Sequence, residues 1–161
     1  MRRRVIAAAA LALVAGASCG TGSDADGHFR VERHARRTTT LIDDPGRAEY
    51  CPAESLLTVI AIGRNGAAGF AVRTALPLRQ VSVFAVQPLL GGVGTATAAF
   101  RLASGAARVG TAGQLRLQPS ATIDGDFDVA VPDSLGLTVP FKGKLSRIPV
   151  QTGSPARCST V

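Results

Sequence analysis

Regular alternation of apolar and polar residues in the last third of the chain is the feature that most restricts its fold. A period of two residues is typical of a strand with one buried face. No stretch of this region keeps the period of 3.6 residues that a helix requires. The sequence therefore predicts an antiparallel sheet with one face in a core. Residues expected on the buried faces are Leu115, Leu117, Phe127, Val129, Val131, Leu137, Val139, Phe141 and Leu145.

Four segments further upstream also have strand character. Asn65-Gly66 favours a tight hairpin turn between the first two of them. In the third, Val81, Val83 and Ala85 share one face, and flanking prolines argue against a helix there. We therefore expect an all-β fold of about seven strands, either an antiparallel sandwich or a flattened barrel. These strands cover residues 55–62, 67–76, 79–86, 95–104, 113–118, 125–131 and 137–146.

The first 18 residues have the layout of a secretory signal peptide. Three arginines precede an apolar run over residues 5–15, which small residues follow. The run is shorter than the about 20 residues that a membrane-spanning helix needs. Residues 16–20 also match G-x-S-x-G, the nucleophile motif of serine hydrolases. That motif needs a strand before the serine and a helix after it, so we assign Ser18 to the signal region and not to catalysis.

The end of this signal resembles the lipobox of bacterial lipoproteins, because small residues run directly into Cys19. The resemblance covers residues 1–22 and implies that Cys19 becomes the acylated N-terminus, carrying fatty acids such as palmitate. Gly16 occupies the position where the class usually has a branched aliphatic residue. Ala15 and Ala17 form an alternative cleavage site, which would release a soluble protein beginning at Ser18. The β domain itself resembles no family of known function.

The composition is compatible with one domain in an exported protein. The sequence predicts a signal peptide at residues 1–18, a flexible tether at 19–49 and a β domain at 50–161. Within the tether, short strands at residues 29–31 and 38–42 are an open alternative. The formal charge is +7. Without the signal, 15 basic and 11 acidic residues remain, a balance of +4. Sixteen of the 18 basic residues are arginine in a chain rich in alanine and glycine. Arginine richness here is therefore weak evidence for phosphate binding, and export argues against nucleic acid as a partner.

Two cysteines remain beyond Cys19, and an exported protein can keep them oxidised. Cys51 precedes the first strong strand pattern and Cys158 lies near the C-terminus. Neither has a second cysteine or a histidine at a metal-ligand spacing, which argues against zinc. We therefore predict a disulfide between Cys51 and Cys158 that ties the two ends of the domain together.

Few residues are candidates for chemistry. Asp124, Asp126 and Asp128 resemble the start of a calcium loop, but the glycine and the distal acid of that motif are missing. We expect them to lie on the solvent-exposed face of a strand. Both histidines, His28 and His34, fall in the predicted tether, which cannot supply the fixed geometry of a catalytic base. No catalytic, cofactor or metal site is predicted.

The expected function is a non-catalytic role in binding or structure, for a domain tethered to a membrane of the cell envelope. Its partners would be the membrane, through the lipid anchor, and an envelope polymer or envelope protein. The alternative localisation is soluble, periplasmic or secreted. The alternative function is a β-barrel that carries a small apolar ligand inside, since small barrels can enclose one. The chain has no Trp and one Tyr, which disfavours sites that depend on exposed aromatic stacking.

Overall fold

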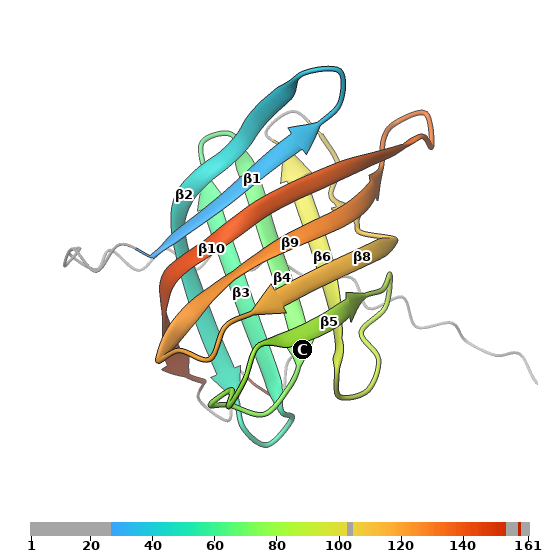
Figure 1. Cartoon of the computed structure of the whole chain (residues 1–161). Helices are drawn as coiled ribbons and strands as arrows, with labels where there is room; N and C mark the ends of the chain where they lie inside the picture. The colour runs from blue at the N-terminus through green and yellow to red at the C-terminus, as the bar shows by residue number, and fades with distance from the viewer. Residues whose placement is uncertain (1–26, 103–104, 154–157, 159–161) are drawn as a thin grey trace, which may run out of the picture.

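A computed structural model describes residues 27–102, 105–153 and 158, and these residues form an all-β protein (Figure 1). The signal peptide, Cys19 and most of the predicted tether lie outside the described residues. No helix in the described part of the chain is long and apolar enough to cross a bilayer. The strands are β1 (His28–His34), β2 (Thr38–Cys51), β3 (Leu56–Gly63), β4 (Gly66–Arg73), β5 (Ser82–Val86), β6 (Thr95–Leu102), β7 (Arg108–Val109), β8 (Ala112–Leu117), β9 (Thr122–Pro132) and β10 (Thr138–Thr152).

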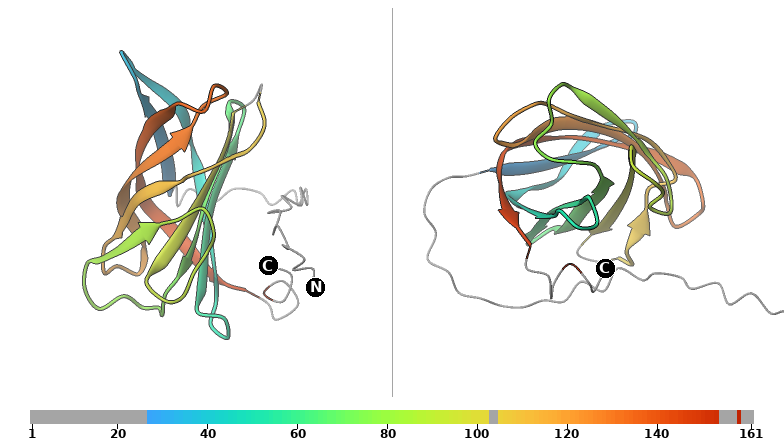
Figure 2. Two further views of the ribbon diagram at one scale, coloured as in Figure 1. Left: turned by 90° about the vertical axis from the view of Figure 1, so that its right-hand side faces the viewer. Right: turned by 90° about the horizontal axis from the view of Figure 1, so that it is seen from below.

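Nine of the ten strands close into a barrel, and the short β7 is an additional strand beside β6. The order around the barrel is β4-β3-β2-β1-β10-β9-β8-β5-β6, and pairing of β6 with β4 closes the ring. The view from below shows this closed outline (Figure 2). The fold is thus all-β as predicted, but it is a closed barrel and not a two-sheet sandwich. Closure removes the exposed strand edges that a sandwich of this size would leave.

The predicted tether over residues 19–49 is wrong from residue 28 onward. His28–His34 and Thr38–Cys51 are β1 and β2, which pair with each other, with β3 and with β10. Seven strands were expected, and these two make up the nine of the barrel. Their outward faces are charged or threonine-rich and their apolar alternation is brief. The sequence pattern therefore gives only a weak indication of strands in this region. Phe29, Val31 and Ile42 nevertheless point into the barrel and are completely buried.

A bulge in β10 allows this long strand to pair with both β1 and β2. β10 pairs antiparallel with β1 as far as Ser146, and its end, from Val150, pairs parallel with β2. Its register with β9 shifts between Leu145 and Ile148, and within this bulge Arg147 has a φ of 51°. Such bulges bend a strand and increase its twist. The bend brings the end of β10 alongside β2.

The predicted buried faces of the last third are mostly correct. Leu115, Leu117, Phe127, Val129, Val131, Phe141 and Leu145 are all in the core and Val139 packs partly buried against it. Leu137 is wrong: it lies in the β9–β10 turn and is 63% exposed. Val81, Val83 and Ala85 do share a face, but that face is the outer one, and Phe84 and Val86 point into the core instead.

The predicted hairpin at Asn65-Gly66 is present, shifted by one residue. Gly63 pairs with Gly66, so Arg64 and Asn65 form the connection between β3 and β4. Gly66 has a φ of +145°, and a side chain there would collide with the Arg101 carbonyl oxygen on β6. Glycine is therefore required both for the backbone conformation and for the close approach of β6.

Candidate functional site

The disulfide predicted from the sequence is present. Cys51 at the end of β2 and Cys158 are bonded, with 5.7 Å between their Cα atoms. Gly153 lies against them: a Cβ there would come within 2.7 Å of Cys158 Sγ and 2.8 Å of Glu49 Oε1. The bridge therefore fastens Cys158 to the end of β2. It packs there against Leu56 and Ala71.

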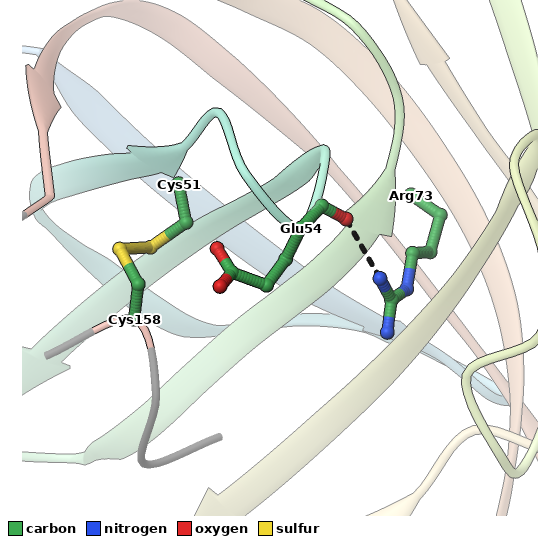
Figure 3. Close-up of a disulfide and its surroundings, with 4 residues drawn as sticks. All are labelled: Cys51, Glu54, Arg73 and Cys158. Carbon is green, nitrogen blue, oxygen red and sulfur yellow. Dashed lines mark hydrogen bonds between the residues drawn. A yellow bond between two sulfur atoms is a disulfide. The ribbon is translucent and has the colours of Figure 1, made fainter. Parts of the chain in front are cut away.

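A carboxylate and a guanidinium lie beside the bridge (Figure 3). The Glu54 side chain points toward the sulfur atoms, and Arg73 Nη1 donates a hydrogen bond to the Glu54 carbonyl oxygen at 2.7 Å. Glu54 Oε2 and Arg73 Nε are buried and have no hydrogen-bond partner among the described residues. The sequence showed Glu54 only as an isolated acid. Its contact with Arg73, 19 residues later, arises because the β2–β3 turn folds over the end of β4.

Cys51, Glu54 and Cys158 are also the one group of three metal-type side chains within the described residues, with ligand atoms within 4.8 Å of one another. Zinc and similar ions bind the thiolate form of cysteine. Both sulfurs are bonded to each other here, so neither can act as a thiolate ligand. The arrangement can hold two chain segments together, and its chemistry as it stands is that of a structural bridge.

The three aspartates lie on the outer side of β9, where the alternation places them. Two of them, Asp126 and Asp128, face lysines of β10 across the strand pair. Lys142 Nζ on β10 is 2.7 Å from Asp128 Oδ2, and Lys144 is the register partner of Asp126. Opposite charges facing each other across antiparallel strands stabilise the pairing modestly.

Asp124 differs from its neighbours because it supports the β10 bulge. Its Oδ1 accepts the Arg147 backbone N–H at 2.9 Å, and its Oδ2 accepts the Thr122 hydroxyl at 2.6 Å. Partial burial alone would raise the pKa of Asp124, but the hydrogen bonds from Thr122, Arg147 and Ser120, with the Arg147 charge, outweigh it. The pKa therefore lies below its usual 3.8. Through these bonds the carboxylate links β9 to the bulge of β10.

The two histidines lie at opposite ends of β1 and not in a tether. His28 Nδ1 is 3.7 Å from Asp43 Oδ1, and His34 Nε2 is 3.2 Å from Glu32 Oε2. A strand of seven residues separates them by roughly 20 Å. They therefore cannot act on one substrate atom together.

The centre of the barrel is filled by aromatic rings from opposite walls. The Phe70 ring centroid on β4 is 4.9 Å from that of Phe127 on β9 and 6.0 Å from that of Phe29 on β1. Phe100 on β6 is 5.1 Å from Phe141 on β10 and completes the cluster. All five rings are at most 6% exposed. The interior at this level is a packed core.

Two surface depressions lie on the outside of the barrel. One, of about 400 Å³, lies at the end of β3, β4 and β6, between the side chains of Arg64, Arg101 and Ile62. The other, of about 390 Å³, lies over β8 and β9 beside Gln114 and Asp128. Both are open to solvent, and their lining residues point outward. Neither depression was predicted, since each is formed by strands that are distant in the sequence.

Comparison with known proteins gives no family for this chain: no protein-family model matches it, and no curated protein or solved structure is significantly similar to it.

Proposed function

We propose that this chain is a non-catalytic domain of a bacterial cell envelope, held at a membrane by acyl chains on Cys19, which acts by binding a partner on its outer surface. The observation that supports binding from outside is the packed aromatic cluster in the barrel. Because aromatic side chains fill the centre of the barrel, a partner would contact its outer walls or one of its two ends. The cross-strand charge pairs on the wall and the hydrogen-bonded Asp124 also have structural roles that require no substrate.

The alternative proposal is a carrier of a small apolar ligand. It is favoured by the closed barrel, since barrels of about this size can hold one small ligand. It requires the rings around Phe70 to move aside, and exposing or displacing buried aromatic side chains is costly. We therefore place the carrier second.

Native mass spectrometry of the protein purified from its own envelope separates the two proposals. The expected result is the mass of the acylated polypeptide alone, unchanged after denaturation. A ligand of constant mass that leaves only on unfolding would overturn the binding proposal in favour of the carrier.

The anchor is tested separately by the intact mass of the mature protein and by cell fractionation. We expect an N-terminus at Cys19 with added acyl mass, and we expect a high-salt wash to release the Cys19→Ala variant, but not the parent, from the membrane fraction. An unmodified N-terminus at Ser18 would instead establish the soluble, exported alternative. Crosslinking in intact cells would then identify the partner, which we expect to be an envelope component.

A further inference from the structure

One end of the barrel collects several chain reversals, and we call it the hairpin end. It consists of the β1–β2, β3–β4 and β9–β10 connections with the adjoining ends of β6 and β7, which lie toward the top of Figure 1 and of the left-hand view of Figure 2. The disulfide lies toward the opposite end. Arginines are concentrated at the hairpin end; they are Arg36, Arg37, Arg64, Arg101 and Arg108.

Within the described part of the chain, these arginines are not in ion pairs. In the ranges that the structure describes, none of the five has a carboxylate oxygen within 4.0 Å. Arg108 donates to the Pro132 carbonyl oxygen at 2.7 Å, which leaves its charge uncompensated. Asp133, in the β9–β10 turn, accepts the backbone N–H groups of Leu135 and Leu137 at 2.8 and 2.9 Å. Glu32, lower on β1, is shared by other basic groups.

Large apolar side chains are exposed among these arginines. Leu135 is 81% exposed and Leu137 63%, both in the β9–β10 turn, whose Pro132 carbonyl accepts the Arg108 bond. Ile62 is 58% exposed and lines the 400 Å³ depression together with Arg64 and Arg101. Half-buried Asp44 lies beside Gly63, so one carboxylate is close to this depression.

The wall of the barrel has a different charge pattern. Its outward side chains form rows across β2, β1, β10, β9 and β8, in which acidic and basic residues are neighbours. One row runs through Asp43, Arg30, Lys144, Asp126 and Arg116, as the strand registers require. Charges close together in such rows largely cancel at a distance. At the hairpin end, by contrast, five arginines outnumber the two acids Asp44 and Asp133, so its net charge is positive.

We propose that the hairpin end docks on the anionic headgroup surface of a lipid bilayer, with the arginines on phosphate groups and Leu135, Leu137 and Ile62 in the interfacial layer. Guanidinium groups match phosphate geometry well. Basic residues near an anionic leaflet strengthen binding, and exposed apolar side chains add to this at the interface. The proposal builds on the function proposed above, because it names the membrane surface as the partner of the outer face.

The length of the tether is compatible with both attachments to one bilayer. Residues 19–26, eight in number, precede Gly27. Eight extended residues span at most about 26–29 Å. β1, with seven residues, rises about 23 Å from Gly27 toward the hairpin end. The tether is thus long enough for the acyl chains on Cys19 to enter the same bilayer that the hairpin end contacts.

The test uses the full mature chain with Cys19→Ser, so that no acyl chain contributes to binding. Sedimentation is measured with vesicles of phosphatidylcholine alone and with vesicles that contain about one third phosphatidylglycerol. We expect binding to the anionic vesicles only, weakened by added salt because the interaction is screened. Each double variant Arg36→Gln/Arg37→Gln and Arg64→Gln/Arg101→Gln should bind at least about tenfold more weakly.

The matched control is Arg116→Gln/Lys144→Gln, which removes the same charge from the wall and should bind within about twofold of the parent. Leu135→Ser/Leu137→Ser should also weaken vesicle binding. The proposal is overturned if the parent does not bind anionic vesicles, or if the wall and hairpin-end variants lose equal affinity for them. It is also overturned, in favour of an anionic polymer, if soluble polyphosphate binds as well as vesicles and the leucine variant behaves as the parent. None of these results depends on the anchor, which the mass of the native protein tests.

Discussion

At the residue scale, Asp124 shows how one side chain can decide the path of a strand. Arg147 is a non-glycine residue in the left-handed region, a conformation that is unfavourable without compensation. The Asp124 carboxylate accepts its N–H, and the Thr122 hydroxyl holds the carboxylate in place. The ionised form is the one that these donors favour. The bend in β10 therefore depends on a charge.

This dependence predicts how stability varies with pH. Because the folded pKa of Asp124 lies below 3.8, its contribution is fully present above the unfolded pKa and is lost as pH falls through the folded value. We expect Asp124→Asn to lower the free energy of unfolding by about 1–2 kcal/mol at neutral pH. The variant should also lose less stability than the parent on acidification below pH of about 4.

Urea unfolding at several pH values measures both effects. The control is Asp126→Asn, which removes an exposed carboxylate from the same strand. Equal pH profiles for the parent and the Asp124 variant would contradict the role given to this carboxylate.

At the scale of elements, neighbouring strands fit because small inward residues face large ones. Gly143 on β10 is the register partner of Phe127 on β9 and of Val31 on β1. A Cβ on Gly143 would overlap the Phe127 ring and the Arg30 carbonyl oxygen. The absence of a side chain at this position lets the ring turn into the barrel centre, where it meets Phe70.

Gly143→Ala should therefore destabilise the barrel by about 1–3 kcal/mol, the usual range for overpacking a core. The expected sign is a lower urea midpoint with an unchanged slope. Gly92→Ala, in the β5–β6 loop with nothing within 4 Å of the added methyl, is the matched control and should change little. If both variants unfold at the same midpoint as the parent, the packing argument for Gly143 is wrong.

At the scale of the whole molecule, hydrogen bonding and one covalent link close the chain on itself. The ring is completed by β4 with β6, and the disulfide fastens the C-terminal segment to the end of β2 across 107 residues. Such a long loop restricts the unfolded chain strongly. In the chain-entropy account its closure is worth up to about 4.7 kcal/mol.

We expect Cys51→Ala/Cys158→Ala, made with Cys19→Ser to avoid mispairing, to lose about 2–5 kcal/mol of stability and to keep its β circular dichroism. The Cys19→Ser protein treated with a dithiol reductant should reach the same lowered stability. The variant should not respond to the reductant at all. A parent whose unfolding is insensitive to reduction would show that the bridge does not constrain the unfolded chain as proposed.

Of the candidate sites, the disulfide and the outward aspartates could be predicted locally. Two cysteines in an exported chain have one pairing, and alternation alone puts Asp124, Asp126 and Asp128 on one side of a strand. The contact of Glu54 with Arg73 and the gathering of arginines at the hairpin end could not be predicted. Both depend on which strands become neighbours, and a period of two residues says nothing about that.

The sequence by itself determined that this protein is built of strands, because alternating side chains can bury one face only on an extended backbone. It also determined the inward residues of β8 and β9. Tertiary structure alone decided that residues 28–51 join the barrel, since the backbones of β1 and β2 must find neighbouring strands, and β10, which pairs with both, is distant in the sequence. It likewise decided that Phe84 and not Val83 faces the core. Both faces of β5 are apolar, and the larger ring fills the space beside Leu115, its register partner on β8.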